Sequence, residues 1–230
     1  MKLIDCPSPN FDERGRGVDT VILHYTGMKT GAEALARLCD GQAKVSAHYL
    51  VEEDGAVYRL VDENRRAWHA GVSSWKGESD INARSIGIEI VNPGHEWGYR
   101  AFPEAQIESV AALLKQIRTR NNIPASRVLA HSDVAPSRKE DPGEKFPWAR
   151  LAAEGLAVPP YDGAPDPAIP YEDALAALRG VGYEVLDVAP GRPAPAAAIL
   201  AFQRRFCPQA LGQGMDPLTK AAALAIARQV

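Results

Sequence analysis

The chain has 230 residues, of which 46% are hydrophobic and 24% charged, a composition typical of a globular protein. Its length allows one large domain, or one domain with a small module. The net charge of −3 gives no reason to expect a nucleic acid or an anionic membrane as partner. No apolar run approaches the roughly 20 residues of a transmembrane segment.

The cysteines and the N-terminus bear on the compartment. Cys6, Cys39 and Cys207 are far apart in the sequence, and three cysteines do not suggest a disulfide framework. Sparse cysteines favour a reducing compartment. The first twenty residues contain no apolar signal-peptide segment. We therefore expect a cytoplasmic protein, with the periplasm or outer membrane as the alternative if a signal sequence has been removed.

The first part of the chain predicts an arm, a strand and a helix. Residues 1–19 are polar and turn-rich, which predicts an extended arm laid over the domain. Residues 20–25 are apolar on both faces and predict a central strand of a sheet. Residues 32–39 carry apolar side chains at helical spacing and predict a short helix.

A β-hairpin is predicted next. Residues 47–52 and 56–60 are apolar runs on either side of an Asp-Gly turn, a strong hairpin signal. His48 lies in the first of these strands. We interpret it as a structural, hydrogen-bonded core histidine rather than a metal ligand.

Residues 68–82 form a predicted loop rich in Gly, Ser and Trp. It contains His69, Trp75 and Asn82. Aromatic residues in a long ordered loop can form the wall of a cleft, or they can cap the hydrophobic core.

The run of residues 85–92 alternates in a way that predicts a strand. Its isoleucines face one way, whereas Gly87 and Glu89 face the other. A carboxylate buried in such a strand needs a partner or a chemical task. A structural salt bridge is the simpler alternative. We favour a chemical task, because Gly87 leaves the face around Glu89 open.

A long amphipathic helix and a short strand follow. Residues 103–122 place apolar side chains on one stripe, which predicts a helix. Residues 128–131 predict a strand that ends in a proline-rich loop, and residues 148–154 predict a short helix. Strands that alternate with helices indicate the α/β class.

Three polar residues at strand ends and in this loop are candidate metal ligands. His24 and His131 each end an apolar run, and Asp141 lies in the loop after His131. Two histidines and one carboxylate, with a fourth place for water, form a ligand set of catalytic zinc sites. By spacing alone, hydrogen-bonded core histidines and a turn aspartate explain these residues as well.

The C-terminal part differs in composition. Residues 157–170 contain five prolines and predict a stiff linker. Helices are predicted over residues 171–179, 194–206 and 217–229. Residues 171–230 are therefore expected to form a small helical module that folds separately. The alternative is a helical extension that buttresses the preceding domain.

Several segments, in this order, resemble the amidase-2 family of N-acetylmuramoyl-L-alanine amidases, which are related to peptidoglycan-recognition proteins, and most closely its AmiD-like members. The segments are ILHYTG, SAHYLV, WHAGVSSW, SIGIEIVN and AHSDVAPSRKEDPGEKFPW. The stretches ILAFQRRFCP and GMDPLTKAA resemble the three-helix peptidoglycan-binding domain. The resemblance implies a central mixed β-sheet flanked by helices over residues 1–156, plus a small C-terminal three-helix domain.

The family also implies site residues and a reaction. It implies a zinc ion held by His24, His131 and Asp141, with Glu89 and Lys139 as catalytic residues. The residues expected to bind substrate are Tyr25, His69, Trp75 and Asn82. The reaction is hydrolysis of the amide between N-acetylmuramic acid, or its 1,6-anhydro form, and L-alanine. The expected partners are therefore muropeptides and anhydro-muropeptides of peptidoglycan.

One residue departs from the family pattern. Some relatives have a tyrosine just before the position of His48, where this chain has Ala47. The role of general base therefore falls on Glu89 alone.

Two other classes of function remain. A non-catalytic peptidoglycan-recognition module typically lacks zinc ligands, and this chain has all three. A zinc peptidase acting on the stem peptide lacks support from an H-E-x-x-H motif.

Overall fold

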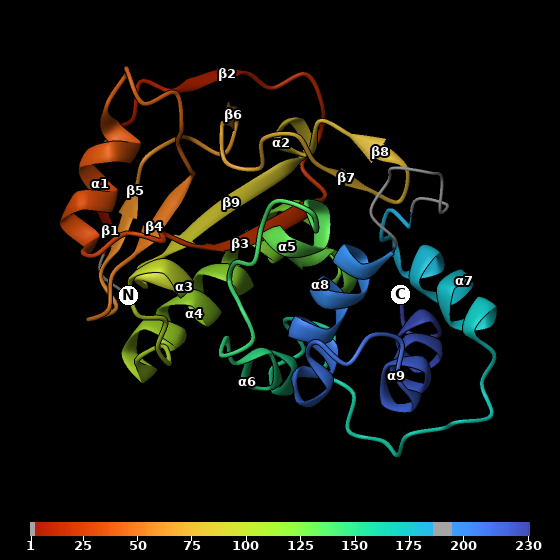
Figure 1. The fold of residues 1–230 in the computed structure, drawn as a ribbon. Coiled ribbons are helices and arrows are strands. Elements are labelled where there is room, and N and C mark those ends of the chain that lie inside the picture. Colours follow the sequence, from red (N-terminus) through yellow and green to blue (C-terminus); the bar gives the residue numbers. More distant parts are fainter. Residues whose placement is uncertain (1–2, 186–194) are drawn as a thin grey trace.

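The computed structural model describes residues 3–185 and 195–230. Its centre is a six-stranded sheet with the order β1-β5-β4-β9-β3-β10 (Figure 1). Its strands are β1 (Leu3–Asp5), β3 (Thr20–Tyr25), β4 (Tyr49–Val51), β5 (Val57–Arg59), β9 (Ser85–Ile90) and β10 (Val128–Ala130). β4, β9, β3 and β10 run parallel, whereas β5 runs antiparallel to β4. The predicted mixed sheet is thus confirmed. The strand predicted over residues 20–25 is β3, which lies between β9 and the edge strand β10.

Helices and two small antiparallel pairs surround this sheet. The pairs are β2 (Phe11–Glu13) with β6 (Arg65–Ala67), and β7 (Ser74–Trp75) with β8 (Glu78–Ser79). The helices are α1 (Gly31–Cys39), α2 (Ile81–Arg84), α3 (Gly94–Trp97), α4 (Glu104–Asn121), α5 (His131–Val134), α6 (Trp148–Ala153), α7 (Tyr171–Val181), α8 (Ala196–Phe206) and α9 (Pro217–Ala227), with short 3-10 turns η1 (Ala125–Arg127) and η2 (Pro208–Ala210).

The predicted helices are found, with small shifts at their ends. The predicted start of α8 at residue 194 lies outside the described residues. The structure differs after β10, where we predicted a loop: His131 begins the short helix α5. The buried Asp133 carboxylate accepts a hydrogen bond from the Ala130 N–H at 2.8 Å, which caps this turn.

One face of the sheet packs on α4. Alternate residues of β3 and β9, such as Val21, Leu23 and Ile88, are fully buried in a core cluster with the apolar stripe of α4, which includes Val110 and Leu114. Asn122 ends α4 in the left-handed conformation, with φ of +53°. This face therefore forms the main hydrophobic core.

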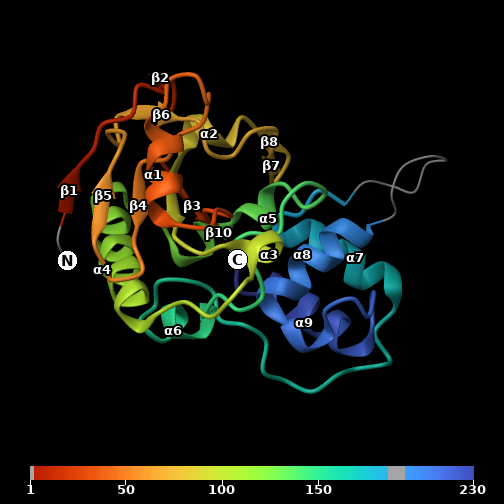
Figure 2. The ribbon, with the colours of Figure 1, turned by 60° about the vertical axis from the view of Figure 1, so that its left-hand side comes forward.

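The opposite face of the sheet is divided between two sets of helices. Leu50 of β4 packs with Ala34 and Leu38 of α1. Figure 2 shows α1 and α4 on opposite sides of β4 and β5. Ile22 of β3 and Leu129 of β10 join a second cluster, which contains residues of α7, α8 and α9. His24 and Glu89 project from the same face as Ile22.

The predicted N-terminal arm is present, and a buried arginine anchors it. Arg14 donates through Nε to the Glu63 carbonyl at 3.0 Å and through Nη1 to the Ala83 carbonyl at 2.9 Å. Its Nη2 donates to the Arg65 and Ser85 carbonyls at 2.6 and 3.0 Å. Burial lowers the pKa of Arg14 to about 10. The arm is thus tied to the loops beside β9.

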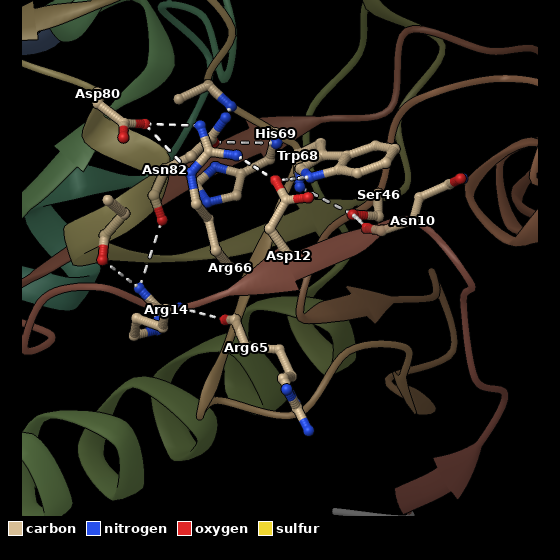
Figure 3. Close-up of polar contacts among 12 residues, drawn as sticks. Asn10, Asp12, Arg14, Ser46, Arg65, Arg66, Trp68, His69, Asp80 and Asn82 are labelled. Carbon is tan, nitrogen blue, oxygen red and sulfur yellow. Dashed lines mark hydrogen bonds and ion pairs between the residues drawn. The ribbon is translucent and has the colours of Figure 1, made fainter.

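A second arm residue holds the loop that begins at Trp68. In Figure 3, Asp12 lies between Arg66 and Trp68. Its Oδ2 accepts from Arg66 Nη1 and from Trp68 Nε1, both at 2.7 Å. Ser46 Oγ accepts from the Trp68 N–H at 2.9 Å and donates to the Asn10 carbonyl at 2.6 Å. The arm therefore fixes where the Trp68 loop starts.

His48 is structural, as its strand position suggested. It is fully buried, and its Nδ1 accepts from the Gly87 N–H at 2.9 Å. Its Nε2 lies 2.9 Å from Nη2 of Arg14 and 3.1 Å from the Arg65 carbonyl. Burial lowers the pKa of His48 to about 4, so the imidazole is neutral near pH 7.

The C-terminal helices share their core with the sheet. Arg205 of α8 forms an ion pair with Asp133 of α5, and both side chains are almost fully buried. Arg205 also donates to the Val128 carbonyl at 2.8 Å, and the Tyr183 hydroxyl donates to Asp133 at 2.5 Å. Figure 1 shows α8 beside α5, and these contacts are those expected of the buttress alternative, whereas separate folding of residues 171–230 stays a prediction.

We predict that Arg205→Ala lowers the free energy of unfolding by roughly 3–5 kcal/mol, because it leaves a buried Asp133 without its counter-charge. Arg204→Ala is the matched control. Arg204 pairs with the half-exposed Glu140, and its loss should change stability by less than about 1 kcal/mol. Urea unfolding measures both. Equally small losses would support a separate module instead.

We predict that His48 makes the protein acid-sensitive. Its pKa is about 4 in the folded state and 6.5 in the unfolded state, so the unfolded state binds more protons between these values. This contribution is complete above about pH 6.5 and is lost as the pH falls toward 4. In metal-free protein, wild type should lose about 2 kcal/mol more than His48→Asn between pH 7 and 5. Parallel pH profiles of the two proteins would contradict this role.

Candidate metal centre

Two parallel strands bring His24 and His131 together. Leu23 of β3 pairs with Ala130 of β10, so the next residue on each strand is a histidine at the same sheet edge. The Nδ1 atoms of His24 and His131 lie 2.9 Å apart. Both side chains are almost fully buried.

Asp141 returns to this edge from the loop after α5. Its carbonyl accepts a hydrogen bond from the Ser132 N–H at 3.0 Å. Its Oδ2 lies 3.1 Å from His24 Nδ1 and 3.0 Å from His131 Nδ1. The three atoms form a nearly equilateral triangle. A tetrahedral zinc ion with bonds of about 2.0–2.1 Å would hold its ligand atoms about 3.3 Å apart, so the triangle fits such an ion.

The hydrogen-bond partners decide which nitrogen of His131 carries the proton. His131 Nε2 lies 3.1 Å from the Ala70 carbonyl, which can only accept. The proton is therefore on Nε2, and the lone pair of Nδ1 points at His24 and Asp141.

A chain of hydrogen bonds assigns His24 in the same way. Ser85 Oγ donates to the Ile81 carbonyl at 2.7 Å, so it accepts from His69 Nε2 at 3.3 Å. His69 Nδ1 then accepts from His24 Nε2 at 3.1 Å. The lone pair of His24 Nδ1 is left facing the triangle.

Three lone pairs thus converge without a proton between them. Burial and the charge of neighbouring His131 lower the pKa of His24 to about 4. Burial raises the pKa of Asp141, whereas the two histidines lower it below its usual range only when they are protonated and donate to its carboxylate. A neutral pair of imidazoles and a carboxylate in this arrangement repel one another unless a cation lies between them. The His24, His131 and Asp141 cluster is therefore a candidate metal centre.

Glu89 lies beside this centre. It is the direct pairing partner of His24 across β9 and β3, so both side chains project from the same face. Its Oε2 is buried without a hydrogen-bond partner among the described residues. Burial and the charge of Asp141 raise the pKa of Glu89 well above its usual value. No ion pair satisfies it within residues 3–185 and 195–230, which argues against the salt-bridge alternative.

The structure gives the glycine at position 87 a different role from the one inferred from the sequence. A Cβ at this position would lie 2.4 Å from Cγ of His69. The missing side chain therefore makes room for the His69 ring, and does not leave the face around Glu89 open.

The metal centre opens into a cavity of about 360 Å³. Glu89 and Lys139 line it together with the three candidate ligands. The remaining lining residues are Tyr25, Thr26, Gly27, Met28, Ala34, Arg37, Leu38, Val45, Ser46, Trp68 and His69. The cavity thus lies on the sheet face between α1 and the loop after α5. Its floor carries Glu89 and the three candidate metal ligands.

The residues expected to bind substrate lie in different places. Tyr25 and His69 line the cavity. Trp75 is not a lining residue: it is buried against Tyr183, with ring centroids 5.1 Å apart. Asn82 is also buried, and its Oδ1 accepts from the N–H groups of His69 and Ala70 at 3.1 and 2.8 Å. Neither Trp75 nor Asn82 is in direct reach of a ligand in the cavity.

Sequence reasoning missed two parts of the site. Trp68, rather than Trp75, supplies the aromatic wall of the cavity. Arg37 of α1 adds a cation to the lining. The i, i+3, i+4 spacing of Ala34, Arg37 and Leu38 places them on one face of a helix. This spacing could have indicated that Arg37 shares the face that lines the cavity.

The comparisons with known proteins agree with this architecture. Residues 14–144 match the family model described as Amidase_2, N-acetylmuramoyl-L-alanine amidase. The chain is also 36% identical to N-acetylmuramoyl-L-alanine amidase AmiD of Escherichia coli over 91% of this chain and 82% of that protein. The chain belongs to the amidase-2 family of N-acetylmuramoyl-L-alanine amidases.

Other relatives cover the same region. A 1,6-anhydro-N-acetylmuramyl-L-alanine amidase AmpD of Citrobacter freundii is 41% identical over 48% of this chain and 57% of its own length. Among solved structures, AmiD of E. coli, in complex with the substrate anhydro-N-acetylmuramic acid-L-Ala-D-γ-Glu-L-Lys, superposes with a TM-score of 0.80. That match has 33% identity and covers 95% of this chain and 92% of the other. AmpDh3 of Pseudomonas aeruginosa has a TM-score of 0.80, 30% identity and 95% coverage of both chains.

We predict that Asp141→Asn reduces bound metal to background, because the only anionic ligand of the cluster is lost. Glu140→Gln is the matched control, since this half-exposed neighbour is not one of the three ligands. Elemental analysis after dialysis measures the metal in each protein. A metal content in Asp141→Asn equal to that of the control would show that the ligand set is wrong.

Proposed function

We propose that this amidase-2 family member hydrolyses the amide bond between N-acetylmuramic acid, or 1,6-anhydro-N-acetylmuramic acid, and L-alanine in peptidoglycan fragments. One observation carries the proposal: three unprotonated ligand atoms converge at the floor of a cavity, beside a glutamate whose Oε2 is buried and has no hydrogen-bond partner among the described residues. Relatives with substrate bound in their structures support the choice of substrate class.

We propose zinc as the metal. Two imidazole nitrogens and one carboxylate suit zinc, whereas Mg²⁺ and Ca²⁺ prefer oxygen ligands. When bound, zinc polarises the carbonyl of the scissile amide and lowers the pKa of water. The remaining chemistry falls to side chains of the cavity.

Glu89 is the proposed general base and acid. Its carboxylate takes a proton from the attacking water and passes it to the nitrogen of the leaving L-alanine. Burial and the charge of Asp141 raise the pKa of Glu89, which makes its carboxylate a stronger proton acceptor than that of an exposed glutamate. The Lys139 ammonium, which also lines the cavity, stabilises the oxyanion of the tetrahedral intermediate.

His69 is better explained as a positioning residue than as a substrate contact. Its Nδ1 accepts from His24 Nε2, and Ser85 orients its other nitrogen. This holds His24 in the tautomer that offers Nδ1 to the metal. Asn82 supports the same arrangement by fixing the His69 backbone.

Product analysis distinguishes this function from the two alternatives. An amidase releases the intact stem peptide from a defined muropeptide, and a peptidase releases a shortened peptide. A recognition module leaves the muropeptide whole. Mass spectrometry of such a digest, with the zinc-loaded protein, identifies which products form.

We predict that Glu89→Gln keeps its zinc but loses turnover by at least about 100-fold, because the proton acceptor is gone. Lys139→Met should lower turnover by roughly 100-fold or more with unchanged metal content. Lys145→Ala is the control, since this lysine contacts Tyr99 rather than the cavity lining. Wild-type rates in either of the first two variants would remove that residue from the mechanism.

We predict that His69→Phe weakens zinc binding by roughly 10- to 100-fold, because His24 loses the acceptor that fixes its tautomer. His69→Gln should lose less, since its side-chain carbonyl can still accept from His24. Chelator competition measures the zinc Kd, and thermal melting verifies the fold. An unchanged zinc Kd together with a raised KM for the substrate would instead support a role for His69 in substrate binding.

The compartment stays a prediction, with the cytoplasm ahead of the periplasm or outer membrane. No helix in the described ranges is both long and apolar enough to cross a membrane. The sulfur atoms of Cys6 and Cys39 lie only 3.6 Å apart, a proximity that also suits an oxidising compartment. Fractionation of cells that express the native gene tests the compartment directly.

A further inference from the structure

Two cysteines that are far apart in the sequence meet in the fold. Cys6 follows β1, and Cys39 is the last residue of α1. Their Sγ atoms are 3.6 Å apart, which is van der Waals contact between two sulfur atoms. Both residues are partly exposed, so a small oxidant can reach them.

The backbone on both sides of this pair is fixed. The Cys6 N–H donates to the Arg59 carbonyl at 3.0 Å, which continues the pairing of β1 with β5. Two residues on, Ser8 Oγ donates to the Leu38 carbonyl at 2.6 Å, next to Cys39. Asn10 Nδ2 donates to the Asp40 carbonyl at 2.9 Å, on the other side of Cys39. These bonds hold the arm against the end of α1 and keep the two thiols adjacent.

The third cysteine is in a different setting. Cys207 is fully buried in the cluster under α8, where its Sγ lies 4.0 Å from Thr219 Oγ1. It offers a matched internal control, because it is a thiol of the same chain without an adjacent cysteine at bonding distance.

We propose that Cys6 and Cys39 are a modification site: they form a reversible intramolecular disulfide that fastens the N-terminal arm to α1. A disulfide bond is about 2.05 Å long, so the sulfur atoms, now 3.6 Å apart, must approach by about 1.5 Å. The arm carries Asp12, which bonds the cavity residue Trp68, and α1 carries Arg37 and Leu38 of the same cavity. The link therefore joins α1, which lines the cavity, to the arm that holds the lining residue Trp68.

The oxidant is a small-molecule disulfide, and the exchange balances. One cysteine thiolate attacks a sulfur of the oxidant, which forms a mixed disulfide and releases one thiol. The second cysteine thiolate then attacks the protein sulfur of the mixed disulfide, forms the Cys6–Cys39 bond and releases the second thiol. Burial and the neighbouring thiol raise the pKa of Cys39 to about 11, so the exchange should be faster at higher pH.

The test uses the full chain with oxidised glutathione as the probe. Free thiols, counted under denaturing conditions, should fall from the three of the sequence to one. Peptide mapping should show a Cys6–Cys39 cross-link in monomeric protein. Cys207→Ser should fall from two thiols to none, whereas Cys6→Ser should form no internal cross-link. Three remaining thiols, separate glutathione adducts or cross-linked dimers would each overturn the proposal.

Thermal melting tests whether the bond fastens the arm. Closing a loop between cysteines 33 positions apart should raise the melting temperature of oxidised wild type by roughly 5–10 °C over the reduced protein. Cys39→Ser should melt at one temperature under both conditions. A disulfide that forms without a rise in melting temperature would contradict the fastening role.

Discussion

The site depends on the meeting of three unprotonated ligand atoms at one edge of a parallel sheet. His24 and His131 end adjacent strands in register, and the loop that carries Asp141 folds back to them. Such a cluster is unfavourable by itself, because the lone pairs repel and burial removes water. A divalent cation turns the same arrangement into a strong binding site. Binding of a metal at this cluster would therefore stabilise the fold, because the surrounding structure holds these three atoms together.

Residues that contact the candidate ligands are held in place by further residues from several parts of the chain. Ser85, His69 and His24 form one chain of hydrogen bonds, which sets the tautomer of the ligand. Gly87 leaves space for the His69 ring. On the other side, Asp133 caps the helix that begins with His131 and is neutralised by Arg205 of α8. α8 thus contacts the segment that presents the candidate ligand His131.

Much of this could be predicted from the sequence. Strand and helix positions followed from apolar periodicity, and the side of β9 that carries Glu89 followed from alternation. The ligand set, by contrast, rested on family resemblance, because spacing alone did not separate metal ligands from core histidines. The contact of Asp133 with Arg205 could not be predicted from the sequence, because the two residues lie 72 positions apart.

The roles within the loop after Trp68 were also not predictable. Which of Trp68 and Trp75 lines the cavity depends on the path of the loop, which Asp12 and Asn82 set through individual hydrogen bonds. No periodic pattern encodes such bonds. For the same reason, the contact between Cys6 and Cys39 is a property of the folded arm rather than of cysteine spacing.

The central claim concerns which atoms hold the metal, and a crystal structure of the zinc-loaded protein tests it most directly. Diffraction data collected on both sides of the zinc absorption edge locate the ion by its anomalous signal. We predict one strong peak per chain, within bonding distance of Nδ1 of His24, Nδ1 of His131 and a carboxylate oxygen of Asp141. A peak at the Nε2 atoms, or at another cluster of residues, would contradict it.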